Sequence, residues 1–111
     1  MTANLSILDQ RFPDRERSSI ELPPAVIVRE LAVHFPALPE AVQTTLAYLE
    51  DETAREWTAE AIEQARLHAG TSAGTLLRAE ATGLVRYAYA RDDLSAGAAD
   101  LLRQYLNSLP C

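Results

Sequence analysis

With 111 residues, of which 48% are apolar, the chain is long enough to form one globular domain with one core, but not two. All ten basic side chains are arginines, which excludes Schiff-base chemistry, a phosphate-loop lysine and a lysine general base. The sixteen acidic residues give a net charge of −6, which disfavours binding to nucleic acid or to an anionic membrane and favours a basic partner.

Residues 1–22 are predicted to form an N-terminal arm, followed by a single helical domain over residues 23–111. The second half of the arm is rich in charged and polar residues that do not fit a core element. Leu5, Leu8 and Phe12 are spaced so that they would share one face of a short amphipathic helix. Because so short a helix does not persist alone, we expect these three side chains to be buried by self-association.

Prolines mark the first two predicted helices. Pro24 suits the first turn of a helix over residues 24–35, and Pro36 ends that helix. Its expected inner face consists of Ile27, Leu31, His34 and Phe35. Pro39 opens a second helix that runs to about Glu50. The inner face of the second helix is expected to consist of Val42, Leu46 and Leu49.

A third helix is predicted after a break near residues 51–53. Thr53, followed three residues later by Glu56, is a capping-box pattern. The buried stripe of this helix is expected to consist of Trp57, Ala61, Ala65 and His68. Gly70 would end the helix. The same stretch can also be read as a continuation of the second helix.

The fourth and fifth helices have the clearest periodicity. Ser72 or Thr75 is expected to cap the fourth helix, and Ser95 the fifth, which follows a short turn over residues 91–94. In the fourth helix one side would consist of Leu77, Ala81, Leu84 and Ala88, and the other of Arg78, Thr82, Arg86 and Tyr89. The inner face of the fifth would consist of Ala98, Leu101, Leu102, Tyr105 and Leu109.

These elements indicate an all-α protein, a compact bundle of four to five short helices with an N-terminal arm. No segment alternates apolar and polar residues as a half-buried strand does, and Val and Ile together number nine against thirty-five Ala and Leu. So many alanines indicate a thin core. We therefore expect a homodimer, which would bury additional apolar surface.

The third predicted helix carries a stripe of carboxylates that is our candidate partner-binding surface. It consists of Glu52, Glu56, Glu60 and Glu63. Like charges four residues apart on a helix repel one another, and a surface that tolerates this repulsion suits a basic protein partner. The alternative interpretation is ordinary solvated surface, opposite the buried side of the helix.

A basic and aromatic face on the fourth predicted helix supports a second hypothesis. Arg78, Arg86 and Tyr89 share this face, and two helices joined by a short turn resemble a helix-turn-helix in outline. A DNA-binding regulator would use these two helices. Nearby carboxylates and the negative net charge argue against this alternative, because phosphate contacts need a dense basic patch.

A third hypothesis places a small-molecule or enzymatic site near Glu30 and His34, which are four residues apart on one predicted helix face. The sequence offers no evident nucleophile and no second histidine at a metal-ligand spacing. We therefore expect no catalytic residue, no metal and no cofactor.

The leading hypothesis is a non-catalytic protein-interaction module of the antitoxin, immunity, chaperone or adaptor type. Its partner would bind an acidic or apolar helical face. The single cysteine, Cys111, cannot form an intrachain disulfide, and no segment has the length and apolarity of a signal peptide or a membrane span. We therefore expect a cytoplasmic protein.

Overall fold

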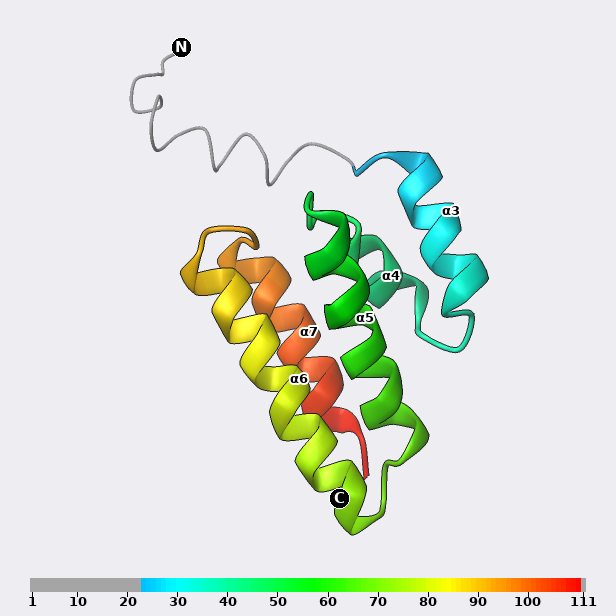
Figure 1. Ribbon diagram of the computed structural model, residues 1–111, viewed down its shortest axis with the longest axis vertical. Coiled ribbons are helices and arrows are strands. Elements are labelled where there is room, and N and C mark those ends of the chain that lie inside the picture. Colours follow the sequence, from blue (N-terminus) through cyan, green and yellow to red (C-terminus); the bar gives the residue numbers. More distant parts are fainter. Residues whose placement is uncertain (1–22, 111) are drawn as a thin grey trace.

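The computed structural model describes residues 23–110, and within this range it contains five helices and no strand (Figure 1). In chain order the helices are α3 (Ala25–His34), α4 (Glu40–Leu46), α5 (Glu52–Leu67), α6 (Ser72–Ala90) and α7 (Ala96–Ser108). The predicted all-helical fold is therefore confirmed. None of these helices is long and apolar enough to cross a membrane.

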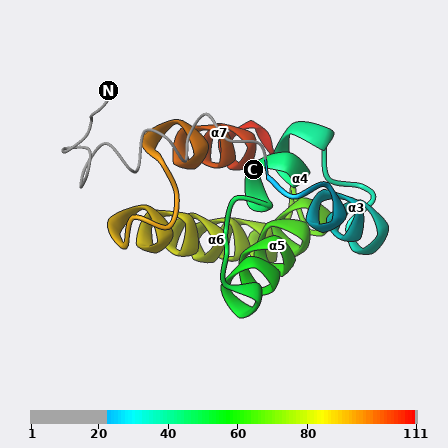
Figure 2. The ribbon, with the colours of Figure 1, turned by 90° about the horizontal axis from the view of Figure 1, so that it is seen from above.

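The helices pack in two layers around a small aliphatic core. α5 and α6 form an antiparallel hairpin, and Figure 2 shows α7 and α4 on one side of that hairpin. α3 packs against α4 at the edge of the bundle. The large side chains with no exposed surface are Leu46, Ile62, Val85, Leu102 and Leu106, so each of the four helices α4 to α7 contributes to one common core.

Most of the predicted inner faces are confirmed. Val42, Leu46 and Leu49 are buried beside α4, and Ala81 and Ala88 are buried on α6. On α7, Leu102 is buried, and Ala98, Leu101, Tyr105 and Leu109 pack against the core. The prediction for α3 was wrong at one position, because His34 is exposed whereas Leu31 is buried.

The predicted buried stripe of α5 was wrong at two of its four positions. Trp57 is 69% exposed and His68 is exposed, whereas Ala65 is buried and Ala61 packs against the core. Ala59 and Ile62, which the predicted stripe omitted, also fill the core. Trp57 precedes Ile62 by five residues, which places the two side chains about 140° apart around the helix. The physical reason for the error is that apolar residues occur on more than one side of α5, so periodicity alone did not select the inner side.

Side-chain caps mark the starts of α5, α6 and α7, but two of them are not the predicted residues. The carboxylate of Asp51 accepts a hydrogen bond of 2.8 Å from the Ala54 amide, and the Thr71 hydroxyl accepts one of 3.0 Å from Gly74. The predicted Thr53 lies inside the first turn of α5, where the backbone is already helical and a residue does not cap. The predicted cap of α7, Ser95, is confirmed by its hydrogen bond from the Ala98 amide.

The turn between α5 and α6 depends on two glycines. Gly70 has a positive φ of 89°, and its amide donates to the carbonyl oxygen of Pro110 at 3.1 Å. A Cβ atom at Gly74 would lie 2.0 Å from the carbonyl oxygen of His68, so only glycine fits there. Helix α5 ends at Leu67, close to the predicted stop at Gly70. The tight turn sets α6 directly against α5.

Candidate functional site

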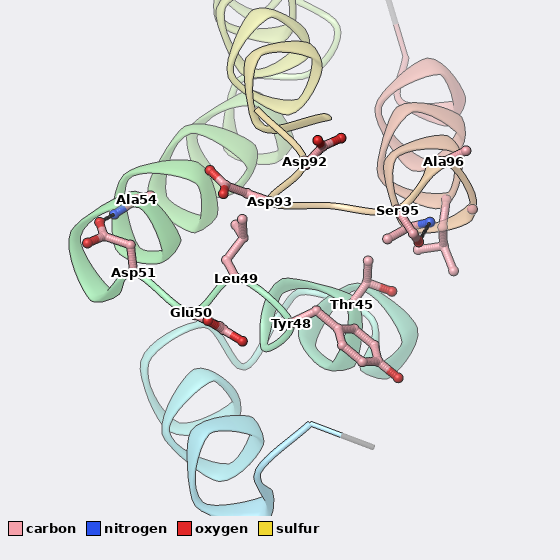
Figure 3. Close-up of a pocket in the computed structure, with 13 residues that line it drawn as sticks. Thr45, Tyr48, Leu49, Glu50, Asp51, Ala54, Asp92, Asp93, Ser95 and Ala96 are labelled. Carbon is pink, nitrogen blue, oxygen red and sulfur yellow. Dashed lines mark hydrogen bonds between the residues drawn. The ribbon is translucent and has the colours of Figure 1, made fainter. Parts of the chain in front are cut away.

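A cleft of about 720 Å³ opens at one end of the bundle, where the connection between α4 and α5 meets the turn between α6 and α7 (Figure 3). We call it the end cleft. The residues that line it are Thr45, Tyr48, Leu49, Glu50, Asp51, Ala54, Asp92, Asp93, Ser95, Ala96, Gly97, Ala98 and Leu101. They come from two segments that are far apart in the sequence, so the cleft exists only in the folded chain.

The first rim of the end cleft is built by a buried arginine. Helix α4 ends at Leu46, four residues before the predicted end at Glu50, and α5 begins at Glu52. Across this break the guanidinium of Arg55 donates to the carbonyl oxygen of Leu49 at 2.7 Å. Arg55 is only 8% exposed. Its guanidinium takes the place of the backbone amide that would donate to the Leu49 carbonyl oxygen if the helix continued. The break therefore separates the second and third predicted helices and presents Glu50 and Asp51 outward.

The second rim is the turn between α6 and α7. Asp92 has a positive φ of 66°, a conformation that aspartate tolerates better than most residues. The amide of Asp93 donates to the carbonyl oxygen of Ala88 at 2.8 Å, and the buried Leu94 anchors the turn in the core. The guanidinium of Arg91 lies 3.4 Å from the Asp93 carboxylate. These contacts hold the two aspartates at the cleft.

The end cleft combines carboxylates with an apolar floor. Figure 3 shows Asp92 and Asp93 on one connection and Glu50 and Asp51 on the other, with Leu49 between them. None of the lining residues is basic, and none is a histidine or cysteine. Such a surface suits a cationic group on an aliphatic stem, as in a lysine or arginine side chain. The two acidic pairs are about forty residues apart in the sequence, and only tertiary packing brings them to one site.

The predicted acidic stripe begins beside the end cleft and continues along α5. Glu52, Glu56 and Glu60 are exposed. Glu63 is half-buried and accepts two hydrogen bonds from the Arg66 guanidinium, at 3.0 and 2.8 Å. This hydrogen-bonded pair raises the pKa of Arg66 above its usual range. The structure therefore leaves three members of the predicted stripe facing solvent and gives Glu63 an internal partner.

The three residues of the predicted basic and aromatic face lie on one side of α6 but differ in their surroundings. Arg78 is half-buried and donates to the carbonyl oxygen of Leu109 at 3.4 Å, a contact that ties α6 to the end of α7. Arg86 and Tyr89 are exposed on α6. The neighbouring Arg91 lies over the Tyr87 ring, 5.6 Å from its centre. The hydrogen bond from Arg91 to the Tyr87 hydroxyl raises the pKa of Arg91 above its usual range.

The remaining predicted sites lie elsewhere. Glu30 and His34 are exposed on α3, and neither lines the end cleft. Leu5, Leu8 and Phe12 lie outside the described residues. Within residues 23–110 no group of three or more His, Cys, Asp or Glu side chains is arranged to hold a metal ion.

Comparisons of the chain with models of protein families, with curated proteins and with solved structures find no match. Within residues 23–110, the end cleft combines concavity, a rim of carboxylates and an apolar floor.

Proposed function

We propose that this protein is a non-catalytic protein-interaction module whose end cleft binds a basic, partly apolar segment of a protein partner. Antitoxins, immunity proteins, chaperones and small adaptors are modules of this kind. The observation that carries the proposal is the convergence of Glu50 and Asp51 with Asp92 and Asp93 around one apolar floor. The exposed carboxylates Glu52, Glu56 and Glu60 extend the same charge along α5.

The two parts of the end cleft would contribute differently to binding. The rim carboxylates attract a basic segment and raise the rate of encounter, but their energetic contribution is reduced by salt. The floor, which includes the half-buried Tyr48, Ala98 and Leu101, supplies apolar surface for the aliphatic stem of an arginine or lysine and for a neighbouring apolar residue. Affinity should therefore need both positive charge and apolar side chains in the partner.

The proposal is tested by selecting displayed random peptides on the full-length protein. We expect enrichment of peptides that combine Arg or Lys with apolar residues. The double variant Glu50→Gln and Asp92→Asn should weaken the selected peptides about tenfold and reduce the salt dependence of association. Asparagine at position 92 tolerates the positive φ that the turn requires.

The matched control removes the same amount of charge away from the cleft. Glu40→Gln with Asp100→Asn changes two exposed carboxylates that do not line the end cleft, and it should leave peptide affinity within about twofold of the wild type. Selection of peptides without basic residues would contradict the proposal. So would an equal loss of affinity in both double variants.

A further inference from the structure

The chain enters the described structure at the end of the bundle where the end cleft opens. α4 follows α3 after a short turn and packs against it, and the side-chain amide of Gln43 donates to the Phe35 carbonyl oxygen at 2.9 Å. Tyr48 and Leu49 follow the end of α4 and line the cleft. Figures 1 and 3 show the start of α3 at this same end of the molecule. Residues 1–22 therefore join the described chain close to the cleft.

These residues are long enough to enter the cleft from their point of attachment. An extended chain covers about 3.3–3.6 Å per residue, so the eight residues that lead from position 15 to Pro23 reach roughly 26–29 Å. A flexible chain of eight residues spans about 15 Å on average. The cleft, at about 720 Å³, holds a few side chains, so a short segment is sufficient to fill it.

A segment in the middle of this N-terminal stretch has the composition that the end cleft suits. Residues 8–15 contain two large apolar side chains and two arginines, and we call these residues the arm segment. The four side chains are Leu8, Arg11, Phe12 and Arg15. The sequence alone favoured self-association for Leu8 and Phe12. The folded chain adds a cleft of its own, whose apolar floor suits the same two side chains.

The arginines of the chain are concentrated around the arm segment. Three of the ten lie within residues 11–17, and no other stretch of seven residues contains more than two. Asp14 and Glu16 belong to the same stretch, but it keeps a net charge of +1 in a chain whose net charge is −6. The opposite sign of charge favours the approach of residues 11–17 to the carboxylates of the cleft.

The rim of the end cleft has carboxylate oxygens available for these arginines. Glu50 is exposed, and its carboxylate has no hydrogen-bond or ion-pair partner among residues 23–110. One oxygen of Asp51 caps α5, which leaves the other oxygen to accept from a guanidinium. On the opposite rim, Asp93 already lies 3.4 Å from Arg91, whose charge would repel a second arginine. Glu50 and Asp51 are therefore the preferred contacts.

We propose that the arm segment occupies the end cleft of its own chain and that a protein partner must displace it. Phe12 covers the apolar floor. Arg11 and Arg15 lie against the rim formed by Glu50 and Asp51. This inference rests on the proposed function, since it identifies a competitor for the same site.

Attachment to the chain makes even a weak contact effective. A segment on a short flexible tether has an effective concentration of about 1 mM, so an intrinsic dissociation constant of about 0.1 mM gives an occupancy of about nine-tenths. The apparent affinity for a partner falls in proportion to the fraction of open clefts, which is about tenfold in this case. A partner compensates by contacts outside the cleft, for example with the exposed Glu52, Glu56 and Glu60 along α5. The arm segment therefore selects partners that bind α5 as well as the cleft.

Disulfide trapping in the full-length chain tests the contact without any partner. In a Cys111→Ser background, Gln10→Cys in the arm segment is combined with Ala96→Cys in the cleft. Equilibration with a glutathione redox buffer measures the effective concentration of one thiol at the other. We expect an internal disulfide with an effective concentration at least about tenfold higher than for Gln10→Cys with Ala79→Cys. Ala79 is also an exposed helical alanine, but it does not line the cleft.

Charge reversal distinguishes docking from the proximity that the tether alone provides. Arg11→Glu with Arg15→Glu should lower the effective concentration for the Ala96→Cys pair by at least about fivefold, because it places like charges at the rim. Arg86→Glu with Arg103→Glu reverses two exposed arginines that do not line the cleft, and it should leave the value within about twofold. Circular dichroism verifies that each variant is folded.

The affinity for peptides selected on the end cleft tests the displacement. Full-length Phe12→Ala should bind these peptides about three- to tenfold more tightly than the wild type, because the arm segment then leaves the cleft open more often. Ile20→Ala is the matched control. It removes an apolar side chain from residues 1–22 outside the arm segment and should leave the affinity within about twofold.

The proposal would be overturned by an effective concentration at Ala96 that is no higher than at Ala79, or that does not change when Arg11 and Arg15 are reversed. Disulfide-linked dimers in place of the internal link would also overturn it, because they assign the arm segment to a second copy. Unchanged peptide affinity for Phe12→Ala would do the same, while peptide binding itself supports the proposed function. Internal trapping without any selected peptide would instead reject the proposed function and keep the contact between arm segment and cleft.

Discussion

The guanidinium of Arg55 donates a hydrogen bond of 2.7 Å to the carbonyl oxygen of Leu49, six residues earlier in the chain. It also reaches the carbonyl oxygen of Glu50 at 3.5 Å. Both oxygens lie in the break between α4 and α5, where no helical amide is placed to bond them. A buried side chain thus replaces backbone hydrogen bonding and shapes one rim of the end cleft.

Arg55→Ala should therefore lower the free energy of unfolding by about 2–4 kcal/mol, since it leaves the Leu49 carbonyl oxygen buried without a donor and creates a cavity. Arg55→Lys keeps a charge and a donor and should cost less. Urea denaturation measures both changes, with Arg29→Ala on the exposed side of α3 as the control. Equal effects of Arg55→Ala and Arg29→Ala would show that the hydrogen bond contributes nothing.

Trp57→Ala should lower the free energy of unfolding of the monomer by less than about 1 kcal/mol, because the ring is 69% exposed. Leu102→Ala removes a side chain with no exposed surface and should cost about 2–5 kcal/mol. Urea unfolding at low protein concentration compares the two variants. A larger loss for Trp57→Ala than for Leu102→Ala would return Trp57 to the core, where its sequence pattern had placed it.

Two glycine substitutions should change stability in opposite directions. Gly74→Ala would bring a Cβ atom to 2.0 Å from the His68 carbonyl oxygen, so the turn before α6 must move. We expect a loss of more than about 2 kcal/mol. Gly97→Ala adds a methyl group in open space near the start of α7 and should stabilise the protein by up to about 1 kcal/mol. Thermal unfolding distinguishes the two, and a similar melting temperature for both would contradict this account.

Burial raises the pKa of the Tyr105 phenol above its usual value, although the charge of Arg66 acts in the opposite direction. The folded state therefore keeps this proton at a pH where the unfolded state has lost it. The contribution of Tyr105 to stability should be complete below about pH 10 and decline as the pH rises further.

Tyr105→Phe removes the titrating group, so the variant should lose less stability than the wild type between about pH 9 and pH 11. Urea unfolding across this range measures the difference in unfolding free energy between Tyr105→Phe and the wild type. Below about pH 9 this difference should not depend on pH. Tyr87→Phe serves as the control, because Tyr87 is 61% exposed. Parallel stability curves for Tyr105→Phe and the wild type would refute the prediction.

Local signals predicted the helices well because they act within a few residues. Ser95 caps α7 as expected, Pro36 follows the end of α3, and Gly70 takes the positive φ that ends the α5 segment. The inner face of α6 was also predictable, since Ala81 and Ala88 are buried on one side and Leu77 and Leu84 are half-buried beside them. Such signals need no knowledge of what packs against the helix.

The side of α5 that enters the core was decided only by tertiary packing. Ile62 and Trp57 both belong to apolar stripes, and the choice between them depends on where α6 and α7 lie. The burial of Arg55 could not be predicted from the sequence either, because an arginine beside several glutamates is typical of a helix surface. Its burial follows from the carbonyl oxygens to which it donates, and only the folded chain places these oxygens.

By itself the sequence determined the helical class, the approximate helix ends and the acidic character of the chain, because propensity, capping and charge are properties of neighbouring residues. Tertiary structure alone decided that Glu50 and Asp93 share one cleft, and that Gly83 faces away from the core of its own chain. Both results depend on contacts between residues distant in sequence. No local pattern specifies such contacts when alanines offer several helix faces of similar apolarity.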